Sequence, residues 1–406
     1  MGLGHPIYTG RHIGNGRPYV RNGGIAVTVP GSGGAAAALG GGGNGRVSLP
    51  PLGEQRFVPD EVIVEFFTNT SQPAIVQLTR RYNLSTVESQ RFPLIGTTLY
   101  RLHIGSGRSV RSTLATLRNQ GIVAEAQPNY LFALQEDNNQ TATAAAGDPV
   151  QYVLTKLQVA QAQMIATGKE VPVAVIDSEI DANHPDLGGS IGKAFDALGG
   201  PETPQLHGTE MAGAIASHGK LLGIAPGVEL LAARAFDGHS GGTSFAIYKS
   251  LQWAADSGAR VVNMSFVGPF DPDMRRMLAA AADKAIVLIA AGGNGGPDSG
   301  PQYPASDANV IAVAATDSKD GLFALDNRNQ YIALAAPGVD ILSLAPDDAY
   351  QVSTGSSIAA AQVSGIAALM LQIQPALKPR DVRAILTATA KPLFAGENSS
   401  FEPRLV

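Results

Sequence analysis

The sequence predicts an α/β domain with a doubly wound, mostly parallel sheet, preceded by a small α+β unit. Between residues 171 and 316, short apolar runs alternate with segments of helical period. The runs VPVAVID, VELLAARAF, ARVVNMSF, AIVLIAAGG and NVIAVAAT lack strict alternation, which is typical of strands buried on both faces of a parallel sheet. HGTEMAGAIASHG, SFAIYKSLQWAADSG and DPDMRRMLAAAADK lie between them. This order predicts strands joined by right-handed helical crossovers.

A smaller unit with a different pattern precedes that domain, between residues 54 and 134. DEVIVEFF, TTLYRLHI and VAEAQPNYLFAL are typical of strands, and a further strand is expected around Ser85–Phe92. PAIVQLTRRYNL and SVRSTLATLRNQ have the apolar spacing that indicates helices. The order strand, helix, two strands, helix, strand predicts a ferredoxin-like α+β fold.

The remaining segments differ in composition from both units. Residues 1–53 contain no Asp or Glu, four Arg and the run GSGGAAAALGGGGNG, so we expect a disordered, weakly basic arm. Residues 135–149, QEDNNQTATAAAGDP, form a polar linker between the two units. The larger domain is expected over residues 150–395, with a short tail at 396–406.

Composition excludes several classes of function. The chain has 406 residues, a net charge of −5 and no cysteine. The charge argues against nucleic acid as a partner, and the lack of cysteine excludes disulfides, a thiolate nucleophile and thiolate metal ligands. No run of about 18 uninterrupted apolar residues occurs, so no membrane span is expected. The first residues also contain no apolar stretch of the signal-peptide type.

Four polar residues lie where the strands end or the helices begin. Asp177 ends VPVAVID, His207 opens HGTEMAG, Asn294 follows AIVLIAAGG, and Ser357 opens the last long helix. Ligands of open α/β sheets bind outside the carboxyl ends of the strands, so chemistry is expected there. Asp, His and Ser together can activate a serine nucleophile, and an Asn amide can donate to an oxyanion. Each residue alone also fits an ordinary turn or cap, so spacing leaves both interpretations open.

The segment QVSTGSSIAAAQVSG, residues 351–365, raises the same alternatives. It places four Ser or Thr within five positions before an alanine-rich helix, although an N-cap needs only one hydroxyl. It is either a capped core helix or a nucleophile held at a helix N-terminus. Gly355 allows a tight turn there, and the alanines keep the first helical turns thin.

Three longer motifs decide between these alternatives. VAVIDSEIDANHPDL, HGTEMAGAIA and GSSIAAAQVSGIAALM occur in this order and resemble the three motifs of the subtilisin-like serine proteases, or subtilases. The resemblance extends through LGIAPGVELLAARAF, VVNMSF, AAGGN, YPAS and NVIAVAATD, and covers roughly residues 155–390. It implies a serine endopeptidase in which Asp177 orients His207, and His207 is the general base and acid. Ser357 is then the nucleophile, and Asn294 donates to the oxyanion.

The resemblance also implies a use for the smaller unit. Residues 54–134 resemble a prodomain that assists folding and inhibits the enzyme until it is cut away. We expect the enzyme to cut its own chain between Gln135 and Asp148, with the alanine-rich run TATAAAG lying in the substrate groove. The resemblance also implies an extracellular or periplasmic location, because members of this family are typically secreted.

Further expectations concern substrate and ions. Protein or peptide substrates are expected to bind along Ser265, Phe266, Val267 and Gly292. No cofactor is required for the chemistry, and no metal ligand is assigned. Structural calcium is possible in the family, although no loop here has oxygen ligands dense enough to name.

Departures from the family motifs leave one rival function. Glu179 stands where the motif has Gly, which puts a second carboxylate near Asp177 and costs about 1 kcal/mol if positive φ is required. Phe266 and Val267 replace Leu and Gly, and Val267 is expected to narrow a pocket. The rival is a catalytically impaired scaffold that binds peptides. An α/β-hydrolase esterase is excluded, because its chain order would be Ser, acid, His.

Overall fold

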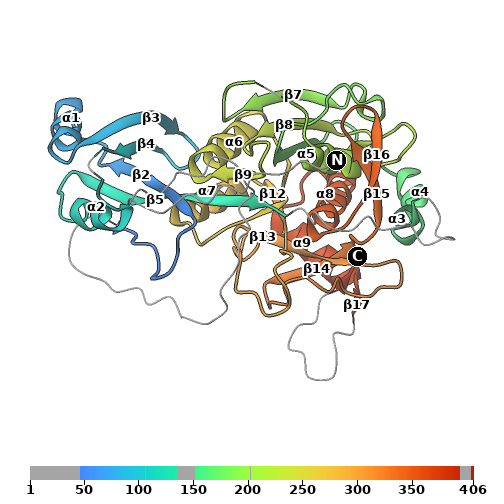
Figure 1. Cartoon of the computed structure of the whole chain (residues 1–406). Coiled ribbons are helices and arrows are strands. Elements are labelled where there is room, and N and C mark those ends of the chain that lie inside the picture. The colour runs from blue at the N-terminus through green and yellow to red at the C-terminus, as the bar shows by residue number, and fades with distance from the viewer. Residues whose placement is uncertain (1–45, 106, 136–150, 202, 394–403) are drawn as a thin grey trace, which may run out of the picture. The chain divides into compact units, whose positions relative to one another are not determined.

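A computed structural model describes residues 46–105, 107–135, 151–201, 203–393 and 404–406. All of them belong to one unit of the chain, Gly31–Val406. Most of the expected arm and of the polar linker, including TATAAAG, lies outside the described residues. Figure 1 shows the chain and labels most of the elements by the names used below.

The smaller unit confirms the predicted ferredoxin-like fold. Its sheet has the order β1-β5-β2-β4-β3, antiparallel throughout except that β1 runs parallel to β5. The strand β1 (Arg46–Val47) lies in the segment expected to be a disordered arm, and its pairing with β5 adds it to the sheet instead. The other elements are β2 (Phe57–Phe66), α1 (Gln72–Arg81), β3 (Leu84–Phe92), β4 (Thr97–Ile104), α2 (Val110–Leu117) and β5 (Val123–Leu134).

The larger domain confirms the predicted doubly wound sheet. Its nine strands have the order β17-β18-β14-β13-β12-β10-β6-β8-β7, and every neighbouring pair is parallel except β17 with β18. The expected tail contributes β18, which pairs with β14 and therefore belongs to the sheet. The strands are β6 (Pro172–Asp177), β7 (Ile191–Asp196), β8 (Glu229–Arg234), β10 (Val261–Met264), β12 (Val287–Ala291), β13 (Val310–Thr316), β14 (Ile332–Pro337), β17 (Lys391–Pro392) and β18 (Arg404–Leu405).

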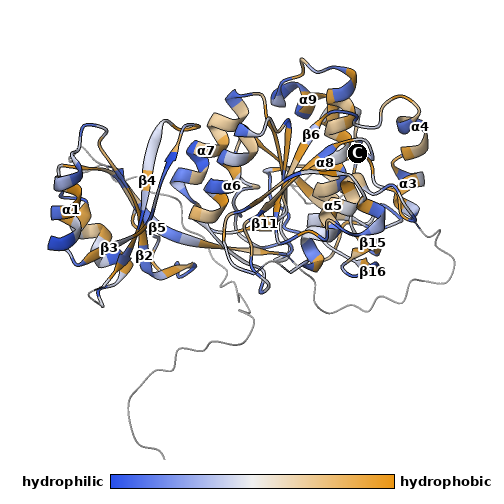
Figure 2. Ribbon diagram, turned by 90° about the horizontal axis from the view of Figure 1, so that it is seen from above, coloured by the Kyte–Doolittle hydropathy of each residue, from blue (hydrophilic) through white to orange (hydrophobic). Residues whose placement is uncertain are grey.

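Helices cover both faces of this sheet. Along β6, Val173 and Val175 belong to the apolar cluster that contains α5 (Leu206–Ala216) and α8 (Ser356–Ile373). Ala174 and Ile176 belong to the opposite cluster, with α6 (Ser244–Asp256) and α7 (Pro272–Asp283). Strands buried on both faces need apolar residues at successive positions, which explains the unbroken apolar runs in the sequence. In Figure 2 the strands at the centre of the domain are correspondingly hydrophobic.

Helix α8 passes through the middle of the domain and has small residues where it packs closely against its neighbours. Its length and composition would be enough to cross a membrane, but most of the helix is buried in this domain. A methyl group on Gly365 would lie 2.7 Å from Cβ of Ile224, so the helix approaches its neighbour too closely for any side chain. Packing within the domain therefore explains the apolar composition of α8.

The remaining elements are short. They include α3 (Tyr152–Lys156), α4 (Val159–Gln163), a 3-10 turn (Pro185–Leu187) and α9 (Pro379–Thr389). A hairpin of β15 (Ile341–Ala345) and β16 (Ala349–Ser353) leads into α8. Two very short strands, β9 (Gly241–Thr243) and β11 (Phe266–Val267), pair with neither the large sheet nor each other, but with β5.

Candidate active site

The expected site residues come from adjacent strand ends and from two packed helices. Asp177 is the last residue of β6. The segment after its neighbour β10 carries Ser265, and the segment after the next strand, β12, carries Asn294. His207 and Ser357 are each the second residue of a helix, α5 and α8, and these helices pack against each other. The carboxyl edge of the sheet thus supplies all of the residues that the motifs predict.

Asp177 and His207 form a buried pair. Nδ1 of His207 lies 2.8 Å from Oδ1 of Asp177, and both side chains are nearly inaccessible to solvent. The same Oδ1 accepts the Ser178 N–H at 2.7 Å, which fixes the carboxylate. Because Nδ1 donates to a carboxylate, the proton of the neutral ring lies on Nδ1, and Nε2 carries the lone pair.

A close approach of backbone holds the histidine in place. The Ser178 hydroxyl accepts the Gly208 N–H at 3.0 Å, and a methyl group on Gly208 would lie 2.4 Å from the Ser178 carbonyl oxygen. Only glycine can therefore follow His207 with this geometry. The motif HGTEMAG contains both His207 and Gly208, but the reason for the glycine is the close approach of the Ser178 backbone, which only the structure shows.

Ser357 begins α8 after an unusual turn. Gly355 has φ 156° and ψ 160°, a conformation that is essentially restricted to glycine. The hydroxyl of Ser357 donates to the Ser265 carbonyl at 3.4 Å, and the Ser265 hydroxyl donates to the Ser357 carbonyl at 3.1 Å. These two bonds tie the start of α8 to the segment between β10 and β11.

Ser356 orients the amide of Asn294. Oδ1 of Asn294 accepts the Ser356 N–H at 3.1 Å and the Ser356 hydroxyl at 2.8 Å. Its Nδ2 is buried, makes no hydrogen bond among the described residues, and lies 2.9 Å from the position that a Cβ on Gly355 would take. The amide donor is thus fixed beside the turn that leads into Ser357.

Strand β5 leaves the smaller sheet and enters the space beside these residues. Its last residues pair with β11 on one side, Leu134 opposite Phe266 and Ala133 opposite Val267, and with β9 on the other side. Both pairings are antiparallel, so β5 becomes the central strand of three. This is the strand-addition mode in which proteins bind extended peptides. The paired residues lie upstream of TATAAAG, the run expected in the groove.

Phe132 anchors this end of β5 in an aromatic pocket. Its ring packs edge-on against Phe266, with centroids 5.9 Å apart, and the Phe236 ring packs against Phe266 at a tilt, with centroids 5.0 Å apart. A methyl group on Gly268 would lie 2.3 Å from the Phe132 ring, so the pocket depends on that glycine. Phe132 is only 2% exposed, which leaves almost its whole side chain buried.

Gln135 follows at the site itself. Its side-chain Oε1 accepts the backbone N–H of Asn294 at 3.0 Å. Its carbonyl oxygen lies 3.7 Å from the position that a Cβ on Gly355 would take, on the same side as Asn294 Nδ2. Sequence reasoning missed this role for Gln135, because it assigned the residue to the linker.

The expected substrate-binding residues differ in their surroundings. Ser265 and Phe266 are fully buried, and Val267 is half-buried beside Gly293. Gly292 has both backbone groups engaged within the domain: its N–H donates to Val313, and its carbonyl accepts from two side chains. The structure therefore brings Phe266 and Val267 against β5, whereas the backbone groups of Gly292 are bonded within the peptidase domain.

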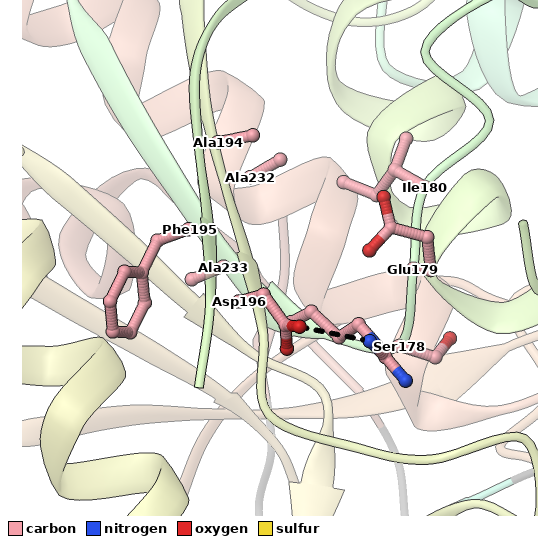
Figure 3. A pocket seen from close by; sticks show the side chains of 9 residues that line it. Ser178, Glu179, Ile180, Ala194, Phe195, Asp196, Ala232 and Ala233 are labelled. Atoms are coloured by element: carbon pink, nitrogen blue, oxygen red, sulfur yellow. Dashed lines mark hydrogen bonds and ion pairs between the residues drawn. The ribbon is translucent and has the colours of Figure 1, made fainter. Parts of the chain in front are cut away.

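Glu179 is not strained in the way its motif position suggested. It does not appear among the described non-glycine residues with positive φ. Its side chain lines a cavity of about 90 Å³, shown in Figure 3, together with Ser178, Asp196 and Arg234. Arg234 donates to Asp196 at 3.1 Å within this cavity. No backbone cost is therefore attached to the glutamate.

The smaller unit also caps two helices of the larger domain. Oδ1 of Asn129 accepts the Phe245 N–H in the first turn of α6, and Oε1 of Gln127 accepts the Asp273 N–H in the first turn of α7. Both amide side chains are fully buried. The first N–H groups of a helix lack intrahelical partners, so these contacts satisfy donors that would otherwise need water. The sequence placed Gln127 and Asn129 correctly in a strand but gave no sign of these contacts, because their partners lie more than 100 residues away in the chain.

An ionic cluster lies at the same interface. Nη1 of Arg276 lies 2.8 Å from Glu65, 2.6 Å from Glu125 and 2.9 Å from Asp273. Burial raises the pKa of Asp273 well above its usual range, and the carboxylates of Glu125 and Asp271 raise it further. Burial likewise raises the pKa of Glu125, against the opposing effect of Arg276, with smaller lowering effects from Arg46 and Arg275.

Among the described residues, the carboxylates of Glu65, Glu125 and Asp273 lie close enough together to share a cation. Arg276 already lies among them and supplies the positive charge. We therefore assign no metal to this cluster, and the calcium expected from the family stays a prediction.

Comparisons with known proteins agree on the family. Residues 168–402, more than half of the chain, match the model of the subtilase family, and residues 46–129 match the fervidolysin N-terminal prodomain. Thermitase from Thermoactinomyces vulgaris is 35% identical over 228 residues, which cover 54% of this chain and 81% of thermitase. Subtilisin DY from Bacillus licheniformis is 37% identical over 240 residues, covering 55% and 84%.

Fervidolysin from Fervidobacterium pennivorans is similar in both sequence and fold. It is 32% identical over 264 residues, which cover 55% of this chain but only 38% of fervidolysin. The crystal structure of fervidolysin, described as a keratinolytic enzyme related to subtilisin, superposes with a TM-score of 0.72 and 23% identity. That match covers 89% of this chain and 62% of the other, and it supports the fold alone. The chain belongs to the subtilase family of serine peptidases and carries a fervidolysin-like prodomain ahead of its peptidase domain.

Proposed function

We propose that Asp177, His207 and Ser357 hydrolyse peptide bonds as a catalytic triad, and that the protein is made as a zymogen that processes itself. The observation that carries this proposal is the end of β5. An extended segment pairs with β9 and β11, and the carbonyl of the next residue, Gln135, lies near Gly355 at the turn into α8, where the buried amide of Asn294 also lies. A substrate of an acyl-transfer enzyme needs this arrangement.

The first step is attack by the Ser357 hydroxyl on a substrate carbonyl carbon. A serine hydroxyl is a poor nucleophile until a base takes its proton, and Nε2 of His207 is that base. The hydroxyl turns from the Ser265 carbonyl toward Nε2 as the proton transfers. Asp177 holds the ring in the required tautomer and stabilises the imidazolium that forms in a buried environment.

The negative charge that develops on the carbonyl oxygen is stabilised by fixed donors. Asn294 Nδ2 is one donor, held in place because Ser356 occupies its amide oxygen. The backbone N–H of Ser357 at the start of α8 is the other, aided by the positive end of the helix dipole. Preorganised donors cost no reorganisation during the reaction, which is why they accelerate it.

Collapse of the tetrahedral intermediate completes the acylation. His207 returns its proton to the leaving amine, the C–N bond breaks, and the acyl group remains on Ser357 as an ester. A water molecule then attacks the ester with His207 again as base, which releases the carboxylate and restores the serine.

The rival function is a subtilase scaffold that binds peptides without cutting them. It would use the same strand addition between β9 and β11 but would need no activated serine. A fluorophosphonate probe that reacts with activated serines separates the two functions. Labelling of wild type, abolished by Ser357→Ala, supports the peptidase.

Substitution of the triad should remove most activity. We expect Ser357→Ala or His207→Ala to lower kcat by about 10⁶ and Asp177→Asn by about 10⁴, since the three act as a unit; these magnitudes come from a subtilisin, a member of this family. Asn294→Ala should lower kcat by about 10² to 10³ with KM nearly unchanged, on the same precedent. Hydrolysis of a chromogenic peptide measures both parameters.

The outcome that contradicts the triad is retention of activity in Ser357→Ala after purification away from other proteases. For Asn294, a higher KM at unchanged kcat would make it a binding residue. Gln362→Ala offers a matched control, because Gln362 lies on α8 beyond the first turn and lines a cavity whose lining residues include no member of the triad.

Self-processing follows from where β5 ends. Antiparallel pairing with β11 ends at Leu134, opposite Phe266, and the next residue, Gln135, accepts the Asn294 N–H with its side chain. We therefore place the bond after Gln135 at the proposed nucleophile. This bond falls within the window of Gln135 to Asp148 expected from the sequence. The cut strand stays paired with β9 and β11, and the prodomain is thereby an inhibitor of the enzyme that it leaves.

We therefore expect the stable product of wild type to begin at Glu136. The full-length protein should lose residues 1–135 on incubation, whereas Ser357→Ala should keep its full mass, because cleavage needs the serine. Intact mass and N-terminal sequencing of both proteins give the answer. A cut that appears equally in Ser357→Ala, or fully active wild type that is never cut, would contradict self-processing.

Release of the cut prodomain should depend on pH. The raised pKa values of Asp273 and Glu125 mean that the assembled interface holds protons that the separated parts release. The stabilisation of the complex by these bound protons is complete below the ordinary carboxyl pKa of about 4. It is lost as pH rises through the raised pKa values. The affinity should therefore fall as pH rises above the ordinary carboxyl range.

Recovery of activity after dilution of the processed complex measures this affinity at each pH. Glu125→Gln removes one titrating carboxyl from the cluster around Arg276 and should flatten the dependence. An affinity that increases with pH, or an identical slope in wild type and Glu125→Gln, would show that the cluster does not control release.

The proposal extends to the surroundings of the enzyme. A peptidase that cuts its own prodomain is suited to activation after export, so we propose that it acts outside the cytoplasm on protein or peptide substrates. Structural calcium remains a proposal of the same kind, tested by the change in thermal unfolding temperature on addition of a chelator.

A further inference from the structure

Gln135 shows which side chain fits immediately before the bond to be cut. The turn after β12 presents four successive N–H groups, of Gly292, Gly293, Asn294 and Gly295. Three have acceptors inside the peptidase domain: the Val313 carbonyl, the Ser356 hydroxyl and Oδ1 of Asn327. The Asn294 N–H alone among these four donates to the prodomain, to the side-chain Oε1 of Gln135.

This donor is fixed, and it belongs to the backbone. The Asn294 amide oxygen is anchored to Ser356, and the neighbouring N–H groups are held by their own acceptors. A substrate side chain without an acceptor at this point displaces the water that would otherwise bind the Asn294 N–H, and it leaves that N–H unpaired. Sites built to hydrogen-bond a substrate group discriminate against analogues that lack it.

The width of the site favours the same kind of side chain. Cγ1 of Val267 lies 3.5 Å, and Nδ2 of Asn327 2.5 Å, from the position that a Cβ on Gly293 would take. The Val267 side chain therefore takes up space beside Gly293 that a glycine at position 267 would leave open, and a broad ring would compete for that space. A long, unbranched side chain can lie along this wall and bring a terminal oxygen to the Asn294 N–H.

We propose that this enzyme prefers substrates with glutamine immediately before the scissile bond, selected by the backbone N–H of Asn294 and the narrowing by Val267. The inference rests on the proposed function, and it adds a substrate class to it. Phe132, Ala133 and Leu134 supply the preceding residues of a matching substrate, with the aromatic side chain in the pocket of Phe236 and Phe266.

The test uses processed enzyme, freed of its prodomain, and peptides Phe-Ala-Leu-X with a chromogenic leaving group. X is Gln, Met, Leu or Phe; Met matches the length of Gln but lacks its strong acceptor. We expect kcat/KM for Gln to exceed that for Met by about tenfold or more, the usual scale for one lost hydrogen bond to a buried donor. Phe is expected to be poorer still because of its width.

The variant Val267→Gly separates the two parts of the selection. It should raise kcat/KM for the Phe peptide, while the ratio of Gln to Met stays the same, because the N–H of Asn294 is unaltered. In the full chain, Gln135→Met should slow self-cleavage by a similar factor of about ten.

Equal hydrolysis of the Gln and Met peptides would overturn the preference and leave the peptidase function intact. An unchanged Phe rate in Val267→Gly would overturn the narrowing by Val267. Failure to cleave every peptide, by enzyme that also does not react with a fluorophosphonate, would instead contradict the proposed function itself.

Discussion

Strand β5 belongs to two sheets, and the rest of the structure depends on that continuity. Its first part pairs with β2 inside the prodomain, and its last residues pair with β9 and β11 of the peptidase domain. Side chains alternate along a strand, so a shift of one residue would turn Phe132 and Leu134 away from the core. The register inside the prodomain therefore determines which residue lies beside Asn294. A prodomain folded in this register therefore also places Gln135 beside Asn294.

The same continuity explains why the interface combines apolar, amide and charged contacts. Ile63 and Leu99 of the prodomain sheet join the apolar cluster under α6 and α7. Gln127 and Asn129 then satisfy first-turn N–H groups of these helices, and Arg276 joins carboxylates from both domains. The amide contacts are neutral and hold at any pH, whereas the carboxylates lose affinity when they ionise fully. The prodomain is thus held by some contacts that do not depend on pH and by others that do.

Most of the fold could be predicted from local patterns, but β5's second partnership could not. Apolar runs and motif order gave both sheets and brought Asp177, His207 and Ser357 to one edge, because periodicity and strand ends are local properties. Pairing of β5 with β9 and β11 joins segments more than 100 residues apart, and the two glycines of Gly241–Thr243 give that segment little strand propensity of its own. For the same reason the roles of Gln127 and Gln135 were hidden. The cost considered for Glu179 depended on a positive φ, which its backbone does not have.

Amide hydrogen exchange of full-length Ser357→Ala tests the central claim most directly. Peptides that span residues 130–135 and 264–268 report the end of β5 and its partner β11, in a protein that does not cut itself. The account predicts that both exchange slowly, on the timescale of β2 and β4 in the prodomain sheet, because their N–H groups lie in paired strands. Exchange of both peptides at the rate of a free chain, while β2 and β4 stay protected, would show that β5 ends in solvent and does not occupy the active site.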